Sequence, residues 1–415
     1  MSLNQKFVSQ TIPTQNLRQK IEQEIAKRGP IPFSRYIELC LYDAELGYYS
    51  RNAEQFGKAG DFYTSSDVHA VFGRLLARQF EEIWRTLGSP PQIEFLEPGP
   101  GRGLFARDVL DWSEKRFPEF FAALHYSLLE RSPALQSRLQ ETLGRFLATG
   151  KSSLVSDLPR HSGQRESLPP QSETQIPRSA RDDKKVSSLD RPLIVFANEF
   201  FDALPPEVLS EQGQLYITFA NGRLTETWLP PSAPALEFLD RYSVHPEPGE
   251  RIEAPLAAQT YMERTAAAIH RGIVIGIDYG YTREEQLSGR HRGTITAYRQ
   301  HSVSTNPYEA PGEQDITAHV NFTALAAAAA QRGMDPHPLV TQSQFLLGIG
   351  EGNEFADAFD ECRVPQERAK VALQLKHLVT PAGLGETFHV LIASKRIDPG
   401  SVQRLSGLSF GKEKP

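Results

Sequence analysis

Three closely spaced glycines lie in a short segment that is suited to binding a nucleotide-like ligand. The stretch Ile93-Glu-Phe-Leu-Glu-Pro-Gly-Pro-Gly-Arg-Gly103 begins with apolar residues that predict a strand over 93–97, and the residues after it predict a helix from Leu104 to about Trp112. Glycine lacks a Cβ and tolerates positive φ, so a glycine loop between a strand and a helix lets a ligand approach the backbone closely. The candidate ligand-contacting residues in this segment are Glu97, Pro98, Gly99, Gly101 and Gly103.

The spacing of these glycines separates two kinds of cofactor. A dinucleotide fingerprint has the form GxGxxG and would place its third glycine at position 104, where this chain has Leu104. A GxGxG loop preceded by an acid, here Glu97, resembles motif I of class I methyltransferases, which hold the methionine part of S-adenosylmethionine. That cofactor carries an ammonium and a sulfonium instead of a pyrophosphate, so a carboxylate favours it. The alternative is an ordinary turn with packing glycines.

Two further acids follow predicted strands. Glu130 ends a predicted strand over 126–130, where a carboxylate can accept hydrogen bonds from both ribose hydroxyls of a nucleoside. NAD would use the same carboxylate, so Glu130 does not distinguish the two cofactors, and a glutamate at a strand end is also common on surfaces. Asp157 follows a weaker predicted strand over 153–156 and could border the adenine, or serve only as a helix cap or solvated loop residue.

Acidic and aromatic residues are grouped in the segment Phe196-Ala-Asn-Glu-Phe-Phe-Asp-Ala-Leu-Pro205. It follows an apolar strand predicted over 193–198, and in an open α/β sheet such a carboxyl end lies next to the ligand of the first strand. Asn198, Glu199 and Asp202 beside two phenylalanines could hold a cationic nitrogen such as a guanidinium by paired hydrogen bonds and ring stacking. The alternative is that Asn198 and Asp202 are turn and cap residues and that the phenylalanines belong to the core.

Strands and helices alternate along the chain and must position these residues. Beyond the elements above, the pattern predicts helices over 133–146 and 365–377 and strands over 272–278 and 387–393. Such alternation predicts an α/β fold, in which a parallel sheet carries helices on both faces. Asp278 ends the strand over 272–278, before a Tyr-Gly-Tyr turn, and should face the same crevice; a capping role is the alternative.

Composition divides the chain into four parts. Residues 1–88 are expected to form an N-terminal segment of helices and loops that packs on the cofactor site, and within it residues 21–66 are expected to form short helices and loops rather than sheet. The α/β domain is expected over 89–203 and 263–415, and residues 204–262 look like a small inserted subdomain that can cover a substrate. Residues 159–190 hold few apolar side chains, too few to offset the entropy of ordering, which predicts a disordered insertion.

The overall composition excludes several classes of protein. Hydrophobic residues make up 39% of the chain, charged residues 23%, and the net charge is −6, without the basic excess of a nucleic-acid binder. Cys40 and Cys362 belong to no Cys/His cluster, so neither a metal site nor a disulfide framework is expected. No apolar run approaches the roughly 18 residues of a membrane span. The N-terminus has no secretion or transit signal, which predicts a bacterial-type cytoplasm.

Segments spread along nearly the whole chain resemble the MidA-like family, whose mitochondrial member is a complex I assembly factor that dimethylates an arginine of a complex I core subunit. The resemblance implies a class I methyltransferase (Rossmann-like) fold, S-adenosylmethionine as cofactor and an arginine of a protein, such as a complex I subunit, as methyl acceptor. It leaves the oligomeric state open, a homodimer included. The matching stretches are Gly29–Tyr36, Leu46–Tyr49, Gly57–Ser65, Glu97–Gly103, Asn198–Pro205, Ile277–Tyr281, Gly312–Phe322 and Gly385–Phe388.

The resemblance also implies roles for residues that match the family's motifs. Asn198, Glu199 and Asp202 map to the acceptor side, where Glu199, helped by Asp202, would orient the guanidinium for in-line attack on the methyl carbon. The guanidinium pKa lies above about 12, so its proton leaves most easily as the nitrogen is alkylated. Two alternatives are an NAD-binding α/β enzyme and a non-catalytic assembly protein that retains the fold. Cofactor binding is implied for Glu97, Gly99, Gly101, Gly103 and Glu130, with Gly60, Asp61 and Thr64 nearby.

Overall fold

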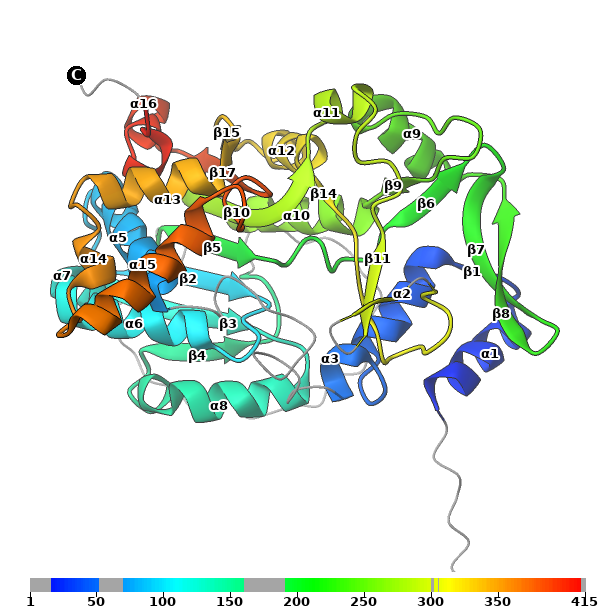
Figure 1. The fold of residues 1–415 in the computed structure, drawn as a ribbon, viewed down its shortest axis with the longest axis horizontal. Coiled ribbons are helices and arrows are strands. Elements are labelled where there is room, and N and C mark those ends of the chain that lie inside the picture. Colours follow the sequence, from blue (N-terminus) through cyan, green and yellow to red (C-terminus); the bar gives the residue numbers. More distant parts are fainter. Residues whose placement is uncertain (1–15, 52–69, 160–190, 300–301, 305, 412–415) are drawn as a thin grey trace, which may run out of the picture.

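The computed structural model describes residues 16–51, 70–159, 191–299, 302–304 and 306–411. A large mixed sheet lies beside a smaller unit of strands and helices (Figure 1). Apart from residue 159, the insertion predicted over 159–190 falls outside the described residues, and so do Gly60, Asp61 and Thr64.

Five parallel strands form the centre of the large sheet in the spatial order β4, β3, β2, β5, β10. From β2 the chain builds outward to β4 and then returns to the other side of β2 as β5. In open α/β sheets the carboxyl ends of strands at such a reversal leave a crevice that binds ligands. The bounds are β2 Ile93–Pro98, β3 Leu124–Leu129, β4 Ser152–Val155, β5 Leu193–Asn198 and β10 Gly272–Tyr281.

The other edge of the sheet departs from the prediction in two ways. Strand β17 (Phe388–Lys395) pairs antiparallel with β10, so the sheet is mixed and not wholly parallel. The Tyr-Gly-Tyr turn predicted after Asp278 is wrong, because Gly280 and Tyr281 continue β10 and pair with β14 (Val320–Asn321). A Cβ at Gly280 would lie 2.1 Å from the Val320 carbonyl oxygen, so this close pairing requires glycine. The short strands β15 (Asp335–Pro336) and β16 (Val340–Thr341) pair with β17.

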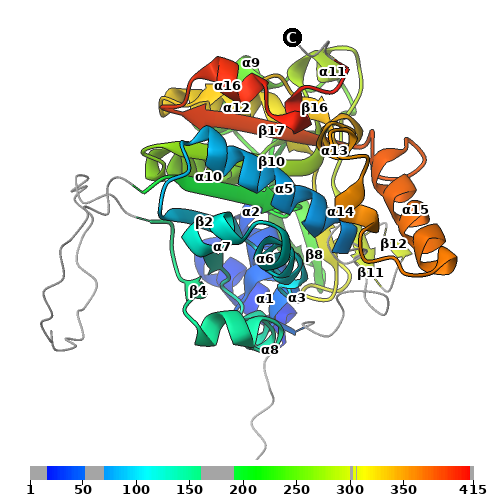
Figure 2. The same cartoon turned by 90° about the vertical axis from the view of Figure 1, so that its left-hand side faces the viewer.

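Helices cover both faces of the sheet (Figure 2). One apolar core joins a face to α5 (Ala70–Thr86), α6 (Leu104–Arg116) and α13 (Gln342–Glu351), and a second core joins the opposite face to α10 (Leu256–Ala268) and α12 (Phe322–Gln331). In α5 the apolar residues recur at helical spacing, and Phe80 among them packs on Phe95 of β2. The remaining helices outside the smaller unit are α7 Pro118–Ala123, α8 Pro133–Ala148, α9 Ala233–Tyr242, α11 Arg283–Leu287, α14 Ala356–Phe359, α15 Pro365–Val379, α16 Pro399–Gln403 and a 3-10 turn Ser406–Leu408.

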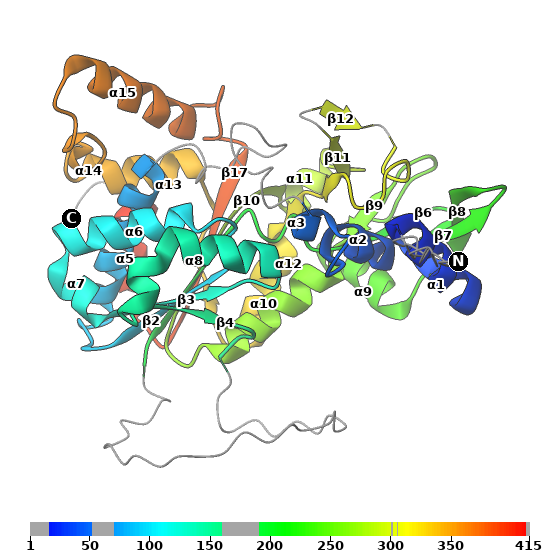
Figure 3. The ribbon, with the colours of Figure 1, turned by 90° about the horizontal axis from the view of Figure 1, so that it is seen from below.

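The smaller unit, here called the cover, lies against the carboxyl ends of the parallel strands (Figures 1 and 3). Side chains from the N-terminal helices, the inserted strands and a later segment share one apolar core, with Leu17, Ile217 and Ile316 among its members. Strand β1 pairs with β7 through Ile31 and Ile217, so this N-terminal segment contains sheet, contrary to the prediction. The cover comprises α1 Leu17–Arg28, α2 Phe33–Tyr42, α3 Tyr48–Arg51, β1 Ile31–Pro32, β6 Glu207–Ser210, β7 Gly213–Ala220, β8 Arg223–Leu229, β9 Ile252–Ala254, β11 Thr296–Arg299, β12 Ser302–Ser304 and β13 Asp315–Thr317.

The described residues contain neither a membrane-spanning helix nor a cluster of metal ligands. None of their helices combines the length and the apolar character that crossing a membrane requires. Over the same residues, the side chains of His, Cys, Asp and Glu form no group of three or more that could hold a metal ion.

Candidate functional site

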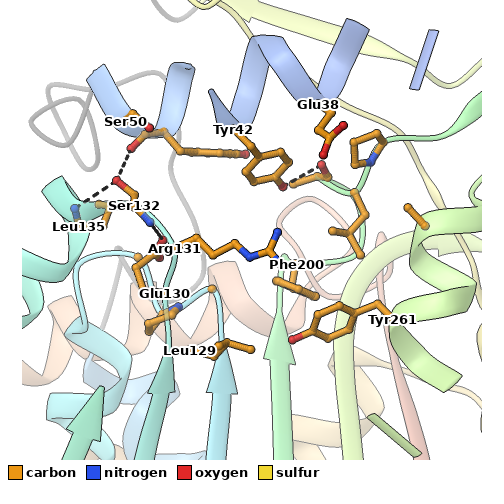
Figure 4. Close-up of a pocket in the computed structure, with 18 of the residues that line it drawn as sticks. Glu38, Tyr42, Ser50, Leu129, Glu130, Arg131, Ser132, Leu135, Phe200 and Tyr261 are labelled. Atoms are coloured by element: carbon orange, nitrogen blue, oxygen red, sulfur yellow. Dashed lines mark hydrogen bonds between the residues drawn. The ribbon is translucent and has the colours of Figure 1, made fainter. Parts of the chain in front are cut away.

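A cavity of about 950 Å³ lies where the cover meets the carboxyl ends of β2, β3 and β5. Its walls come from both units, and Figure 4 shows how side chains from the two sides face one another. The glycine loop and Glu130 line one part, and the loop after β5 lines another. The two segments that the sequence assigned to cofactor and acceptor therefore open into a single space.

The glycine loop turns from β2 into α6 with three glycines at positive φ. Gly99 lies so close to Phe200 that a Cβ there would be 2.9 Å from Phe200 Cδ2. At Gly103, which precedes α6, a Cβ would lie 2.7 Å from Leu139 Cδ2, so this glycine serves helix packing. Of the five predicted residues in this segment, Glu97, Gly99 and Gly101 line the cavity, whereas Pro98 and Gly103 do not.

Glu97 is a buried carboxyl at the end of β2, with its side chain held by Tyr126. The Tyr126 hydroxyl donates to Glu97 Oε2 at 2.7 Å. Burial raises the pKa of Glu97 to about 8, and the hydrogen bond from Tyr126 lowers it only in part. A nearby cation would favour the ionised carboxylate, so this residue is poised to respond to a charged ligand.

Glu130 follows β3 and lines the same cavity. Its Oε1 accepts a hydrogen bond from the Ser132 backbone amide at 2.8 Å, and burial raises its pKa to about 7. The Ser132 hydroxyl donates to the Tyr49 carbonyl oxygen at 3.0 Å, which attaches the cover to the start of α8. Asp157 also lines the cavity, where it pairs with Arg264 at 2.8 Å.

The loop after β5 places Asn198 and Glu199 in the cavity wall. Glu199 has φ +48°, an uncommon conformation for a residue other than glycine, and its amide donates to the Ile277 carbonyl oxygen at 2.9 Å. Asn198 Nδ2 donates to Glu199 Oε1 at 3.2 Å. Backbone strain of this kind clusters at functional sites and is maintained here by the bond to β10.

Asp278 stabilises that loop from below. It is fully buried, and its Oδ2 accepts hydrogen bonds from the amides of Phe200, Phe201 and Asp202 at 3.2, 3.0 and 3.3 Å. Asp278 is absent from the cavity lining among the described residues, so of its two predicted roles the capping role is the one observed. Burial, with the charges of Asp202 and Glu199, raises its pKa well above the usual value.

Asp202 differs from Asp278 because it lines the cavity. Only 3% of the residue is exposed, and its Oδ2 accepts a hydrogen bond from the Tyr279 hydroxyl at 2.6 Å. Its Oδ1 is buried without a hydrogen-bond partner among the described residues. Burial raises the pKa of Asp202 to about 6.

The aromatic residues of the loop divide between cavity and core. Phe200 lines the cavity and packs on Tyr261 of α10 with ring centroids 4.7 Å apart, whereas Phe201 is buried in the core of the sheet. No sequence pattern singles out Tyr261, since a tyrosine in an apolar helix is an ordinary packing residue.

Several residues that line the cavity were not predicted from the sequence. Arg131 follows Glu130 and points into the cavity between that residue and Phe200 (Figure 4). Tyr42 donates to the Ala203 carbonyl oxygen at 2.9 Å, and Tyr49 donates to Asp315 Oδ1 at 3.0 Å. Tyr49 and Asp315 lie in stretches that resemble the family, which was the one signal that could have identified them.

Comparisons with known proteins were made over the whole chain. A family model described as "Putative S-adenosyl-L-methionine-dependent methyltransferase" matches residues 75–340, more than half of the chain. A protein from Burkholderia thailandensis, solved bound to S-adenosyl-homocysteine, matches with a TM-score of 0.74 and 25% identity over 95% of this chain and 94% of its own. The native structure of a Burkholderia thailandensis protein gives the same TM-score and coverage at 26% identity.

Two curated relatives also match most of this chain. "Protein arginine methyltransferase NDUFAF7 homolog, mitochondrial" from Drosophila melanogaster is 28% identical over 396 residues, 91% of this chain and 84% of the relative. "Protein arginine methyltransferase NDUFAF7, mitochondrial" from Mus musculus is 28% identical over 401 residues, with coverage of 92% and 85%. Each is named as a mitochondrial protein, so the expectation of a bacterial-type cytoplasm is wrong: it rested on the N-terminal residues alone.

Proposed function

This chain belongs to the S-adenosyl-L-methionine-dependent methyltransferase family whose model matches residues 75–340, and we propose that its methyl acceptor is an arginine side chain of a protein. Family membership and the neighbour bound to S-adenosyl-homocysteine confirm the expected fold, enzyme class and cofactor. The names of the curated relatives support arginine as the acceptor. The observation that carries the proposal is the acidic and aromatic loop over 198–202, which opens into the same cavity as the glycine loop.

The residues on the cofactor side fit S-adenosylmethionine, which supplies a methyl group bonded to a positively charged sulfur. Gly99 and Gly101 expose backbone to the cavity, and Glu97 offers a buried carboxyl that an ammonium would ionise. Glu130 can accept hydrogen bonds from vicinal ribose hydroxyls. These assignments place the cofactor between the ends of β2 and β3, with Phe200 against the glycine loop.

The residues on the acceptor side fit a planar cation. Glu199 and Asp202 present carboxyl oxygens to the cavity, and Asn198 holds the Glu199 side chain by its hydrogen bond. A carboxylate can accept two parallel hydrogen bonds from one guanidinium, which fixes the orientation of the attacking nitrogen. Holding the nitrogen in line with the methyl carbon contributes much of the rate for such a transfer.

Proton release follows from the chemistry of the acceptor. A guanidinium is fully protonated in water, and it sheds a proton to remain singly charged once one nitrogen carries the methyl group. Glu199 lies at the cavity and can accept that proton or pass it to water. Once the proton has passed to water, the Glu199 carboxylate pairs with the methylated guanidinium, which keeps its positive charge.

Methyl transfer to a peptide library, with S-adenosylmethionine labelled in its methyl group, tests the proposal. We expect label in methylarginine from arginine peptides and none from matched lysine or citrulline peptides. Glu199→Gln should retain S-adenosyl-homocysteine binding and lose methylation. Full activity of Glu199→Gln would remove Glu199 from the mechanism. Label on lysine alone would overturn the arginine assignment, and cofactor binding without any transfer would indicate an assembly protein.

For the identity of the acceptor protein, we propose a subunit of respiratory complex I, as the MidA-like resemblance implies. Deletion of the gene should remove methylarginine from one complex I subunit, as measured by mass spectrometry of the purified complex. Restoration by the wild-type chain but not by Glu199→Gln would support the assignment. An unchanged methylation pattern in the deletion strain would refute it.

A further inference from the structure

Two buried acidic residues from distant segments line the same cavity. Asp202 follows β5, and Asp315 begins β13 of the cover; they are 3% and 1% exposed, yet both line the cavity. The Ala318 amide donates to the Asp202 carbonyl oxygen at 3.0 Å, which joins the two segments. The pair therefore spans the boundary between the cover and the sheet.

Each carboxyl group is held by a tyrosine from another element. The Tyr279 hydroxyl of β10 donates to Asp202 Oδ2 at 2.6 Å, and the Tyr49 hydroxyl of α3 donates to Asp315 Oδ1 at 3.0 Å. Burial raises the pKa of Tyr49 well above its usual value, and the charges of Asp315 and Asp202 raise it further. The bond from the Ala318 amide to the Asp202 carbonyl oxygen keeps the two acid-bearing segments side by side.

One oxygen of this pair lacks a partner in the described structure. Asp202 Oδ1 is buried and accepts no hydrogen bond from the described residues, although the side chain is almost wholly enclosed. A buried acceptor without a donor is costly, and exceptions in folded proteins call for an explanation such as a ligand. A ligand donor that reaches the Asp202 carboxyl group from the cavity would satisfy this oxygen.

We propose that Asp202 and Asp315 together form the subsite for the acceptor guanidinium, with Asp315 as a specificity-determining residue and Tyr49 as the residue that positions it. The inference rests on the proposed function and adds to Glu199 and Asp202 a third acid, which comes from the cover. Acids on both units would bind the guanidinium across their boundary, so the cover takes part in selecting the acceptor.

Charge and shape both favour a guanidinium at this place. During transfer the acceptor cation lies beside the positive sulfur of the cofactor, so two positive charges are close together in a buried cavity. Each carboxylate added beside them offsets more of this charge, so Asp315 strengthens what Glu199 and Asp202 provide. A guanidinium also has five N–H donors in a plane and can bond two acids along different edges, whereas an ammonium is a compact point charge.

Binding measurements on the full chain saturated with S-adenosyl-homocysteine test the subsite apart from catalysis. The probes are a short arginine peptide and its lysine and citrulline counterparts, with Kd measured by calorimetry. The variants are Asp315→Asn and Tyr49→Phe, and the control is Asp335→Asn, an exposed acid at the far edge of the sheet. Affinity for S-adenosyl-homocysteine reports whether each variant keeps its fold.

We expect wild type to bind the arginine peptide at least tenfold more tightly than either counterpart. Asp315→Asn should weaken that binding at least tenfold and Tyr49→Phe by a smaller factor, with S-adenosyl-homocysteine affinity within twofold of wild type. In the methylation assay, Asp315→Asn should raise the KM for the arginine peptide more than it lowers kcat.

Four outcomes separate this subsite from the proposed function. Arginine binding by wild type without methyl transfer would defeat the proposed function and leave the subsite standing. Arginine methylation with an unchanged KM in Asp315→Asn would overturn the subsite alone. Equal losses of peptide and S-adenosyl-homocysteine affinity would assign Asp315 a structural role and also overturn it. Equal binding of the arginine, lysine and citrulline peptides by the wild-type protein would also overturn the subsite.

Discussion

The phenyl ring of Phe200 packs against Gly99, so closely that a methyl group on Gly99 would lie 2.9 Å from Phe200 Cδ2. This contact joins the glycine loop to the loop after β5, which we propose bind the cofactor and the acceptor. Phe200 also packs on Tyr261 with the two rings tilted, so it has limited room to move away. A change at Gly99 is therefore expected to alter both the glycine loop and the loop after β5.

Gly99→Ala is therefore expected to impair cofactor binding. The residue has φ +65°, where an alanine is strained by about 1–3 kcal/mol, and its Cβ would push Phe200 into the cavity. We expect S-adenosyl-homocysteine affinity to fall more than tenfold by calorimetry. Gly144→Ala in α8 is the matched control, since a Cβ there meets nothing within 4 Å, and it should leave affinity unchanged. If Gly99→Ala binds S-adenosyl-homocysteine with wild-type affinity, the Phe200 ring can move away from the added methyl group without cost to binding.

Replacement of Glu97 should change how stability depends on pH. Burial raises the pKa of Glu97 from 4.5 to about 8, so the folded state binds this proton more tightly than the unfolded state. The stabilisation is fully present below about pH 4.5 and is lost as the pH rises through about 8. We expect the Tm of the cofactor-free protein to fall over this range and Glu97→Gln to flatten part of the fall. The control Glu211→Gln, at an exposed residue, should leave the fall in Tm unchanged.

The same pKa predicts a proton released when the cofactor binds. The ammonium of S-adenosyl-homocysteine favours the ionised form of Glu97, so binding near pH 7 should expel a proton and affinity should increase from pH 6 to pH 8. Calorimetry in buffers of different ionisation enthalpy measures this release. We expect a smaller release from Glu97→Gln. An identical release in the variant would assign the proton to another group.

Loss of the Tyr279 hydroxyl should shift the pH dependence of methylation. Burial raises the pKa of Asp202 to about 6, and the hydrogen bond from Tyr279 lowers it in part. Tyr279→Phe removes that donor and should raise the pKa further. Because the ionised carboxylate binds the guanidinium, kcat/KM should rise with pH, and in the variant this rise should occur at higher pH. Tyr216→Phe, away from the cavity lining, is the control; a profile that shifts equally there would refute the assignment.

Asp278→Ala should destabilise the protein and the acceptor loop together. The side chain accepts hydrogen bonds from three consecutive backbone amides, and leaving buried donors unpaired costs about 1–3 kcal/mol each. We expect a free energy of unfolding lower by at least about 3 kcal/mol in urea. Asp335→Ala at the exposed edge should change it by less than about 0.5 kcal/mol. Near-wild-type stability of Asp278→Ala would mean that water replaces the carboxylate.

Local sequence signals predicted the strands and loops of the sheet well. The alternation of apolar runs with helical spacing predicts β2, α6, β5 and α8 within a few residues of their observed bounds. The acids that follow β2, β3 and β5 were found for the same reason, since each directly ends an apolar strand. Residues of this kind are identified by their neighbours in sequence.

The rest of the site depends on contacts between distant segments. Tyr49 and Asp315 are 266 positions apart, and neither has neighbours that predict a shared cavity. Tyr261 repeats the apolar spacing of its helix and gives no separate signal. The Tyr-Gly-Tyr segment carries turn-favouring residues, yet its pairing with β14 extends the strand. Tertiary pairing overrides local preference in each case.

The shared core of the cover determines when the acceptor half of the site can form. Its side chains come from residues near both 17 and 316, so this core is completed only after β13 has been synthesised. Contacts across such sequence separations form slowly, because a long loop must close first. The strands beside the glycine loop can pair earlier during synthesis, because β2 and β3 lie within a stretch of 37 residues. A chain interrupted before residue 296 would lack Asp315, and the core of the cover would lose Ala297 and Ile316, which would expose part of its apolar surface to other proteins.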